Sequence, residues 1–510
     1  MFKFGKRMLA ISLAAFMVLA CPSLFAEEPK QADNQNPPAP KLKITETSLG
    51  KVVDGAIGGT FVISPDLKRV AYEAFRGEKL FVVVDAAEGK EYDSISSDLV
   101  FSADSKRLAY AAARGQKQLV VVDGTEGKEY DQIRKDSIVF SPDSKRVAYV
   151  AGRGEEWVLV VDGNQTNGYG EIHEDSIVFS PDSKRIACVA RRRGQPLVVV
   201  DGVEGREYTI IASDVFFSPD SKRVAYVAQR EWKRVAVVDG GEGKEYGNVG
   251  GFVFSPDSKR FIYNAERAGK FFIVLGNVEG NQYDRPPSGV IFSPDSTRVA
   301  YVAARGENEF VVIDGAEGKE YSGIESDLLF SPDSKRFVYG AYRDGKKIII
   351  VDGVEGKEYD WARYPVFSPD SSRVAYCAGR GKKDFVVVDG AEGKEYDSIS
   401  SDVLFSPDST HVAYAAYRGQ EHWAVVDGKQ GQTYRWVHGW SMVFSPDSKH
   451  IAYLVEADGQ RSIVVDGAQC DKQYRETNEN AGLLFDSPTK FHTLMWRNGE
   501  IFLVEIEITE

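Results

Sequence analysis

The chain has 510 residues and a formal net charge of −13. A surface this acidic repels nucleic acids and anionic lipid headgroups, so neither is expected as a partner. Of the four cysteines, Cys21 lies in the leader, and the other three (Cys188, Cys377 and Cys470) are too few for a disulfide framework.

Residues 1–26 have the layout of a secretory signal peptide. Lys3, Lys6 and Arg7 form a basic start, and the 13 apolar residues Met8–Ala20 follow. A bilayer span needs ~20 apolar residues, so this segment is too short to be one. We expect cleavage after Ala26 and an exported chain, periplasmic or extracellular. Nothing else in the sequence is apolar for long enough to cross a membrane.

An alternative for this leader is lipoprotein processing. Val18-Leu19-Ala20-Cys21 resembles a lipobox, which would place a lipid anchor at Cys21. Residues 27–42 are rich in proline and have almost nothing to bury, so they are predicted to form a disordered, extended linker.

From residue 60 onward the chain repeats one motif, represented by Phe140-Ser-Pro-Asp-Ser-Lys-Arg-Val-Ala-Tyr149. Twelve copies recur at intervals of 37 to 41 residues, which indicates a repeat architecture. Their first residues are Ile63, Phe101, Phe140, Phe179, Phe217, Phe254, Phe292, Phe330, Phe367, Phe405, Phe444 and Phe485.

Residues 136–175 show what one repeat contains. Ser137–Phe140 reads as a short strand that ends in a Ser-Pro-Asp-Ser turn, and Lys145–Ala151 reads as a second strand that ends at an Arg-Gly pair. Trp157–Val161 reads as a third strand that ends at Asp-Gly, a strong hairpin signal. In most copies Glu-Gly-Lys-Glu-Tyr follows as a polar outer strand. The second and third strands are apolar on both faces, so each four-stranded sheet is covered on both sides. Such sheets packed around an axis form a β-propeller.

The motif also resembles the WD40-like repeat of TolB-type β-propellers, over residues 60–510. TolB is the periplasmic component of the Tol-Pal envelope system, so the resemblance implies a propeller fold and an envelope setting. The segment before residue 60 is too short for the separate N-terminal domain of TolB, so Tol-Pal partners are not carried over.

Twelve blades exceed the usual four to eight of a single propeller. We therefore expect two packed half-rings, residues 43–285 with repeats one to six and residues 286–510 with repeats seven to twelve; one large ring is the alternative. The last repeat lacks a fourth strand, and a strand within residues 43–57 is predicted to complete it.

The Arg-Gly turns and the links between blades share one face of the propeller, called here the Arg-Gly face. The Ser-Pro-Asp and Asp-Gly turns share the opposite face, called the Ser-Pro-Asp face. An arginine recurs on the Arg-Gly face in ten repeats: Arg76, Arg114, Arg153, Arg192, Arg230, Arg267, Arg305, Arg343, Arg380 and Arg418. The loops that enter the blades often carry an acid near their end: Asp98, Asp136, Asp175, Asp214, Asp327 and Asp402. We favour a fold-maintaining pair between each arginine and an acid in its own or a neighbouring blade. The alternative is a charged ring aimed at a ligand.

Departures from the repeat are the best candidates for a binding site. Two links between blades carry large side chains where the others are small and polar: Trp361, Arg363 and Tyr364 in one, and Trp436, His438 and Trp440 in the other. Exposed aromatic rings with an arginine and a histidine are typical of interaction hot spots and of sugar-stacking surfaces. The structural alternative is that these rings fill gaps between blades.

The sequence contains none of the common catalytic motifs, so no catalytic residue, metal or cofactor is predicted. Residues 82–98 and 386–402 differ only at Ala86 and Gly390, and such uniform blades favour a scaffold. We therefore predict a non-enzymatic propeller that binds an envelope or periplasmic protein. The alternative is a propeller enzyme, or a carbohydrate- or metal-dependent ligand-binding propeller, that uses the Trp361/Trp436 patch.

Overall fold

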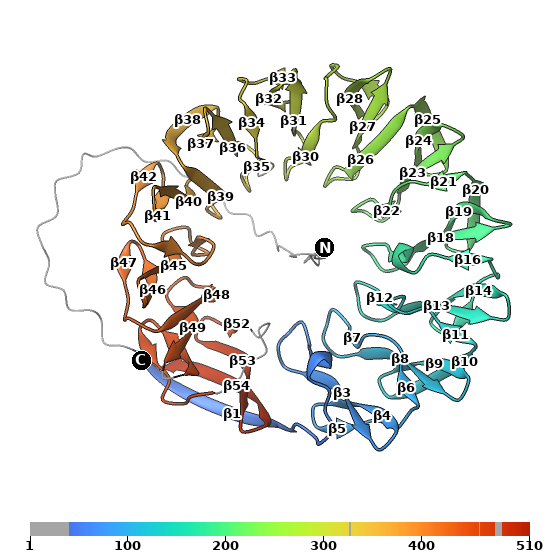
Figure 1. Cartoon of the computed structure of the whole chain (residues 1–510), viewed down its shortest axis with the longest axis horizontal. Coiled ribbons are helices and arrows are strands. Elements are labelled where there is room, and N and C mark those ends of the chain that lie inside the picture. Colours follow the sequence, from blue (N-terminus) through green and yellow to red (C-terminus); the bar gives the residue numbers. More distant parts are fainter. Residues whose placement is uncertain (1–39, 326–327, 458, 475–481, 510) are drawn as a thin grey trace, which may run out of the picture. The chain divides into compact units, whose positions relative to one another are not determined.

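The computed structural model describes residues 40–325, 328–457, 459–474 and 482–509, and it has no α-helix in these ranges. Residues 40–509 form twelve consecutive antiparallel sheets arranged as the blades of one ring (Figure 1). This confirms the predicted all-β propeller. The predicted signal peptide, Cys21 and most of the predicted linker lie outside the described residues, and Asp327 does as well.

Blade three shows the plan of one repeat. Its sheet order is β11 (Gln132–Ile133), β13 (Val147–Arg153), β14 (Glu156–Val161) and β15 (Asn164–Gln165), and β12 (Val139–Phe140) also pairs with β13. The first strand lies on the inside of the ring and the fourth on the outside (Figure 1). Arg153 begins the turn from the second to the third strand, where Gly154 has a φ of 62°, a conformation that glycine adopts without strain.

The second and third strands are the most regular elements. The second strands of blades one to eleven are β3 (Val70–Arg76), β8 (Leu108–Arg114), β13, β18 (Ile186–Arg192), β23 (Val224–Arg230), β27 (Phe261–Arg267), β31 (Val299–Arg305), β36 (Phe337–Arg343), β40 (Val374–Arg380), β45 (Val412–Arg418) and β49 (Ile451–Ala457). The third strands are β4 (Lys79–Val84), β9 (Lys117–Val122), β14, β19 (Gln195–Val200), β24 (Lys233–Val238), β28 (Lys270–Leu275), β32 (Asn308–Ile313), β37 (Lys346–Val351), β41 (Lys383–Val388), β46 (Glu421–Val426) and β50 (Gln460–Val465).

The core lies between the blades rather than within them. Ala109 and Val120 of blade two pack with Tyr149 and Val158 of blade three, and equivalent clusters recur around the ring. Tyrosine and small Ala or Val side chains alternate across these interfaces, which matches the paired apolar faces expected from the sequence. Stability is therefore carried largely by contacts between neighbouring blades, as in other repeat proteins.

The innermost strand differs from its prediction. In blade three it is broken into β11 and β12, so part of the predicted link between blades is strand. The hydroxyl of Ser137 fills the break: it accepts a hydrogen bond from Val150 N (3.0 Å) and donates one to Arg134 O (2.8 Å). A serine side chain here replaces a backbone acceptor, which a strand pattern does not reveal.

In blades six, seven, nine and eleven the inner strand is continuous: β26 (Asn248–Phe254), β30 (Ser288–Phe292), β39 (Trp361–Phe367) and β48 (Trp436–Phe444). The two aromatic segments predicted as links between blades are thus strands, which corrects that assignment. β39 pairs with β40, and β48 pairs with β49, each around a bulge.

Blade twelve is built from both ends of the described chain. Its order is β1 (Lys41–Lys51), β54 (Glu500–Thr509), β53 (Lys490–Arg497) and β52 (Leu484–Ser487). The strand proposed within residues 43–57 corresponds to β1, which begins at Lys41, so the last two residues of the predicted linker are strand. Trp496 and Leu494 pack with Tyr72 of blade one, which closes the ring.

The boundary between repeats six and seven is packed like the others. Ile262 and Ile273 of blade six pack with Tyr301 and Val312 of blade seven. The expected pair of half-rings is therefore wrong, and the alternative of one ring is the observed arrangement. The physical reason is that each blade needs a neighbour on both faces, and a chain of equivalent interfaces offers no place to stop until its ends meet.

Candidate functional site

The recurring arginines of the Arg-Gly face tie neighbouring blades together. Arg114 Nη2 lies 2.7 Å from Glu126 Oε1 in its own blade. The same carboxylate accepts a hydrogen bond from Tyr92 Oη (3.0 Å) and lies 3.3 Å from Lys90 Nζ, both in the preceding blade. The hydrogen bond from Arg114 and these contacts lower the pKa of Glu126 to about 2.

The arginine–glutamate pair recurs in eight blades, and in five of them the glutamate (Glu126, Glu242, Glu279, Glu355 or Glu392) also accepts a hydrogen bond from a tyrosine of the preceding blade. The other pairs are Arg76–Glu88, Arg192–Glu204, Arg230–Glu242, Arg267–Glu279, Arg305–Glu317, Arg343–Glu355 and Arg380–Glu392. Arg153 donates to Gln165 instead (3.3 Å), and Arg418 donates to the carbonyl of Glu395 (2.7 Å).

In these eight blades the arginine pairs with an acid of its own blade, as the structural interpretation of the sequence expects. The acid is the glutamate of the fourth strand, twelve residues downstream, and not the aspartate of the entering loop. Because the glutamate also accepts a hydrogen bond from the tyrosine of the preceding blade in five blades, these contacts join neighbouring blades. A ligand-binding role for the same arginines stays a prediction.

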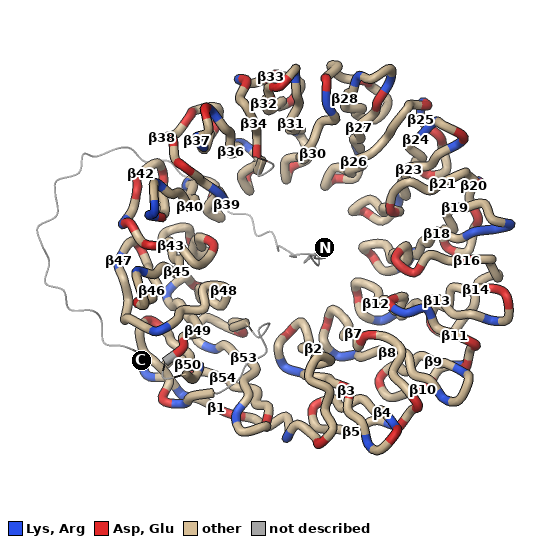
Figure 2. The backbone as a smooth tube through the Cα atoms, viewed as in Figure 1, with Lys and Arg blue, Asp and Glu red and all other residues tan. Residues whose placement is uncertain are grey.

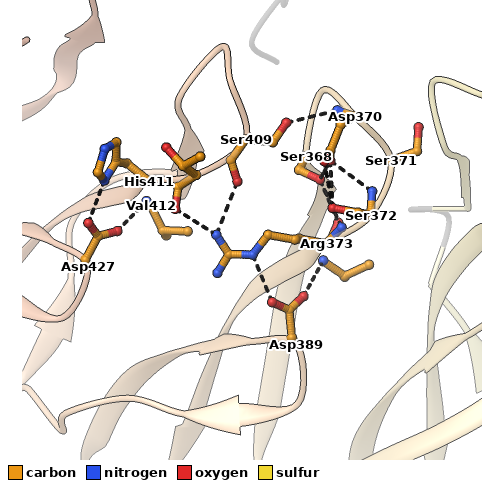
Figure 3. A network of polar contacts seen from close by, with 12 residues as sticks. Ser368, Asp370, Ser371, Ser372, Arg373, Asp389, Ser409, His411, Val412 and Asp427 are labelled. Atoms are coloured by element: carbon orange, nitrogen blue, oxygen red, sulfur yellow. Dashed lines mark hydrogen bonds and ion pairs between the residues drawn. The ribbon is translucent and has the colours of Figure 1, made fainter. Parts of the chain in front are cut away.

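A second contact between blades lies on the Ser-Pro-Asp face (Figure 3). Arg373 Nε donates to Asp389 Oδ2 (2.9 Å), and its Nη1 donates to the carbonyls of Ser409 (3.3 Å) and Thr410 (3.0 Å) in the next blade. Ser409 Oγ also accepts a hydrogen bond from Asp370 N (3.0 Å). We call this set the Arg–Asp clasp. In blades ten and eleven a histidine replaces its arginine, His411 or His450, and keeps only the aspartate contact.

In blade nine the structure brings together the three residues singled out on β39. The guanidinium carbon of Arg363 lies 4.8 Å from the ring centroid of Trp361 and 5.2 Å from that of Tyr364. Arg363 and Tyr364 are exposed, whereas Trp361 is half-buried against the core. Tyr364 has a φ of 56°, which is rare for a bulky residue and turns its side chain outward at the bulge.

Trp361 depends on a glycine opposite it. A Cβ atom added to Gly379 would lie 2.0 Å from Trp361 Nε1, so the indole packs directly over that backbone. Gly379→Ala is expected to push the indole outward and to increase quenching of tryptophan fluorescence by acrylamide. Gly250→Ala in β26, where an added Cβ meets nothing within 4 Å, is the control. Equal quenching in both variants would contradict this packing.

The second aromatic group joins blades ten and eleven. His422 stacks on Tyr417 (4.9 Å between ring centroids) and lies tilted against Trp436 (4.5 Å), and His438 packs edge-on against Trp440 (5.7 Å). Burial lowers the pKa of His422. Burial and the charge of Arg461 lower the pKa of His438 to about 4, so both histidines are neutral at pH 7.

The two groups stay apart. Blade ten lies between β39 and β48, and no contact joins the Trp361 group to the Trp436 group among the described residues. Each predicted group is therefore a local cluster on its own side of blade ten, and a shared binding role for the six residues stays a prediction.

Sequence reasoning missed the most exposed aromatic residue. Trp232 is 88% exposed in the turn after Arg230, where other blades carry glycine. The signal was present, because a departure from the Arg-Gly pattern occurs at that turn. Lys347 of β37 was also missed: it is buried and pairs with Glu325.

Grooves between blades open on the Ser-Pro-Asp face. One of about 700 Å³ is lined by Tyr339 and Gly318, and one of about 560 Å³ by the equivalent Tyr376 and Gly356. Because these grooves repeat with the blades, they are a property of the repeat and not of one site. Within the described ranges no cluster of three or more His, Cys, Asp or Glu could hold a metal, and no helix is long and apolar enough to cross a membrane.

No protein-family model and no curated protein matches the sequence. Among solved structures the fold is similar to TolB from Acinetobacter baumannii, with 18% identity over 51% of this chain and 77% of that one and a TM-score of 0.23. It is also similar to the β-propeller domain of Cps50 (Swd1) from Myceliophteria thermophila, with 9% identity over 50% and 98% of the two chains and a TM-score of 0.23. A eukaryotic initiation factor matches with 13% identity over 65% and 96% and a TM-score of 0.34.

Proposed function

We propose that this protein is a non-enzymatic β-propeller scaffold of the cell envelope that binds a partner protein through its Arg-Gly face. One observation carries the proposal: in the described part of the chain, every exposed aromatic side chain lies at the end of a second strand beside the Arg-Gly turn, in that turn, or on an inner strand that starts from this face. They are Phe75, Trp232, Tyr342, Tyr364, Trp436 and Trp440.

The two faces differ in a way that packing does not require. The exposed apolar residues of the Asp-Gly turns are Val203, Val278 and Val354, and none is aromatic. Aromatic side chains contribute most to protein interfaces because they bury a large area at little cost in side-chain entropy. A folded chain that keeps six of them in water on one side is therefore best explained by a partner.

The remaining parts of the proposal rest on the sequence. Nearly interchangeable blades place like residues around the axis, whereas catalysis needs unlike groups to converge. The basic and apolar layout of residues 1–26 supports export, and the lipid anchor at Cys21 stays an alternative within the same proposal.

Affinity capture from envelope extracts with residues 27–510 as bait tests the proposal. Two variants remove exposed rings from opposite parts of the ring: Trp232→Ala in blade five, and Trp436→Ala with Trp440→Ala in blade eleven. We expect a partner that wild type recovers to be lost by at least one variant, because truncation of a central aromatic anchor costs about 2 kcal/mol or more.

The matched control is Val203→Ala with Val354→Ala, which truncates two residues, each 71% exposed, on the opposite face. It should recover the partner as wild type does. Recovery of the partner by both aromatic variants would contradict the proposal. A second contradicting result would be no captured protein together with a rise in melting temperature on addition of calcium or of a glycan from a panel, because a ligand of the native state must stabilise it.

A further inference from the structure

Arg363 differs from the arginines of the Arg–Glu pairs and of the Arg–Asp clasp in what its guanidinium contacts. Arg380 and Arg373 of the same blade are tied to Glu392 and Asp389, respectively. Arg363 makes no hydrogen bond or ion pair with any described residue, although it is exposed and held near the rings of Trp361 and Tyr364. A cation–π contact positions a guanidinium without using its N–H donors. All five donors therefore remain for a ligand.

Among the described residues no carboxylate forms an ion pair with the guanidinium of Arg363. Burial raises the pKa of the neighbouring Cys377 thiol to about 12; the charge of Arg363 opposes this shift, and the charges of Asp402 and Asp384 add to it. Neither aspartate forms an ion pair with Arg363. Burial and the positive charge of Arg363 lower the pKa of Lys347, which pairs with Glu325, to about 8.

Five other blades carry the opposite charge at the equivalent position of the inner rim. Arg363 lies four residues before Phe367, the first residue of the repeated motif in blade nine. Three or four residues before the first motif residue, five other described blades carry an exposed aspartate: Asp98, Asp136, Asp175, Asp214 and Asp402. Elsewhere Lys and Arg neighbour Asp and Glu along the outer turns (Figure 2). An anionic group that approaches the inner rim is thus repelled at five blades and attracted at blade nine.

We propose that Arg363, with Trp361 and Tyr364, is the receptor for a carboxylate on an acidic segment of the partner protein, an inference that rests on the proposed function. A planar guanidinium with free edges binds a carboxylate through two parallel N–H···O bonds, and the flanking rings receive the apolar part of the segment. A sugar would also need acceptors for its hydroxyl groups, and a guanidinium has none. The observations therefore favour a peptide over an acidic glycan.

A random 12-residue peptide display library, selected in parallel on wild type and on Arg363→Gln, tests this assignment. Wild type should enrich peptides that contain Asp or Glu beside apolar residues, and Arg363→Gln should lose the acidic enrichment. The strongest acidic peptide should bind Arg363→Gln roughly 30-fold more weakly, since removing one member of a paired charge at an interface has effects of this size. Arg363→Lys, which keeps the charge but not the fork, should fall between the two.

Arg380→Gln is the control, because its guanidinium is already paired with Glu392 in the same blade; it should enrich the same peptides as wild type. Melting temperatures of all variants check that they fold. Enrichment of peptides without acidic residues, or enrichment that Arg363→Gln does not change, would overturn the carboxylate receptor while leaving the protein-binding function standing. No enriched peptide on wild type would overturn both. A competition experiment separates a peptide from an acidic glycan. If oligogalacturonate displaced the bound acidic peptide at a lower concentration than the same peptide added free, the site would be assigned to an acidic glycan instead.

Discussion

Replacing Glu46 by alanine is expected to lower the free energy of unfolding by about 2 to 3 kcal/mol, because it leaves partly buried cations without their partner. Glu46 of β1 receives hydrogen bonds from Arg497 Nη1 (2.9 Å) and Nη2 (3.0 Å), from Lys472 Nζ (2.8 Å) and from Tyr474 Oη (2.7 Å). These contacts fasten the N-terminal strand to blades eleven and twelve. Urea unfolding followed by tryptophan fluorescence measures the effect.

The control is Lys43→Ala on the same strand, where the ion pair with Glu507 is exposed and should contribute less than about 0.5 kcal/mol. The loss at Glu46 should also depend on pH. Burial raises the pKa of Glu46, but the hydrogen bonds from Arg497, Lys472 and Tyr474 outweigh it and lower the pKa from 4.5 to about 2. A depressed pKa stabilises the fold above pH 4.5, and this contribution disappears as the pH falls toward 2. A difference between wild type and Glu46→Ala that stays constant from pH 7 to pH 3 would contradict this role.

Completing the Arg–Asp clasp in blade ten is expected to stabilise the ring. His411 Nδ1 lies 2.7 Å from Asp427 Oδ2, as the arginine does in other blades, but His411 donates nothing to the next blade. Ser448 and Lys449 are the equivalents of Ser409 and Thr410 in the next repeat, and Ser448 Oγ accepts a hydrogen bond from Asp408 N (2.9 Å) as Ser409 Oγ does from Asp370 N. His411→Arg should therefore raise the free energy of unfolding by about 1 kcal/mol, a typical gain from restoring a consensus residue.

The reverse change in blade nine is its counterpart. Arg373→His should keep the bond to Asp389 and lose the two bonds to blade ten, for a cost of about 1 to 2 kcal/mol. Thermal unfolding of the two single variants and of their combination measures both effects. The two positions serve neighbouring interfaces and can be compared directly. If His411→Arg lowered the free energy of unfolding, histidine would be the preferred residue in blade ten, and the Arg–Asp clasp of blade nine would not form there.

Much of the fold can be read from the sequence because each blade is specified locally. Two turns define each blade: one contains proline, aspartate and serine, and the following one contains Arg-Gly. The strands between and after these turns are apolar on both sides, so the pattern already requires neighbouring blades on both faces. The repeated motif thus determined the blade, the number of blades and the sorting of the turns onto two faces. It also showed that Arg363 and the tryptophans break the pattern.

Only the tertiary structure decided how those local units are joined. A single ring instead of two half-rings depends on whether the interface after Tyr283 packs like the rest, and side chains from two blades settle that together. The acid that pairs with Arg114 is likewise set by the preceding blade, whose Tyr92 binds the same carboxylate. Arg363 could be named from the sequence, but its lack of a carboxylate partner is a property of the space around it. Local patterns encode the strands, whereas partners across interfaces are chosen by packing between segments about 38 residues apart.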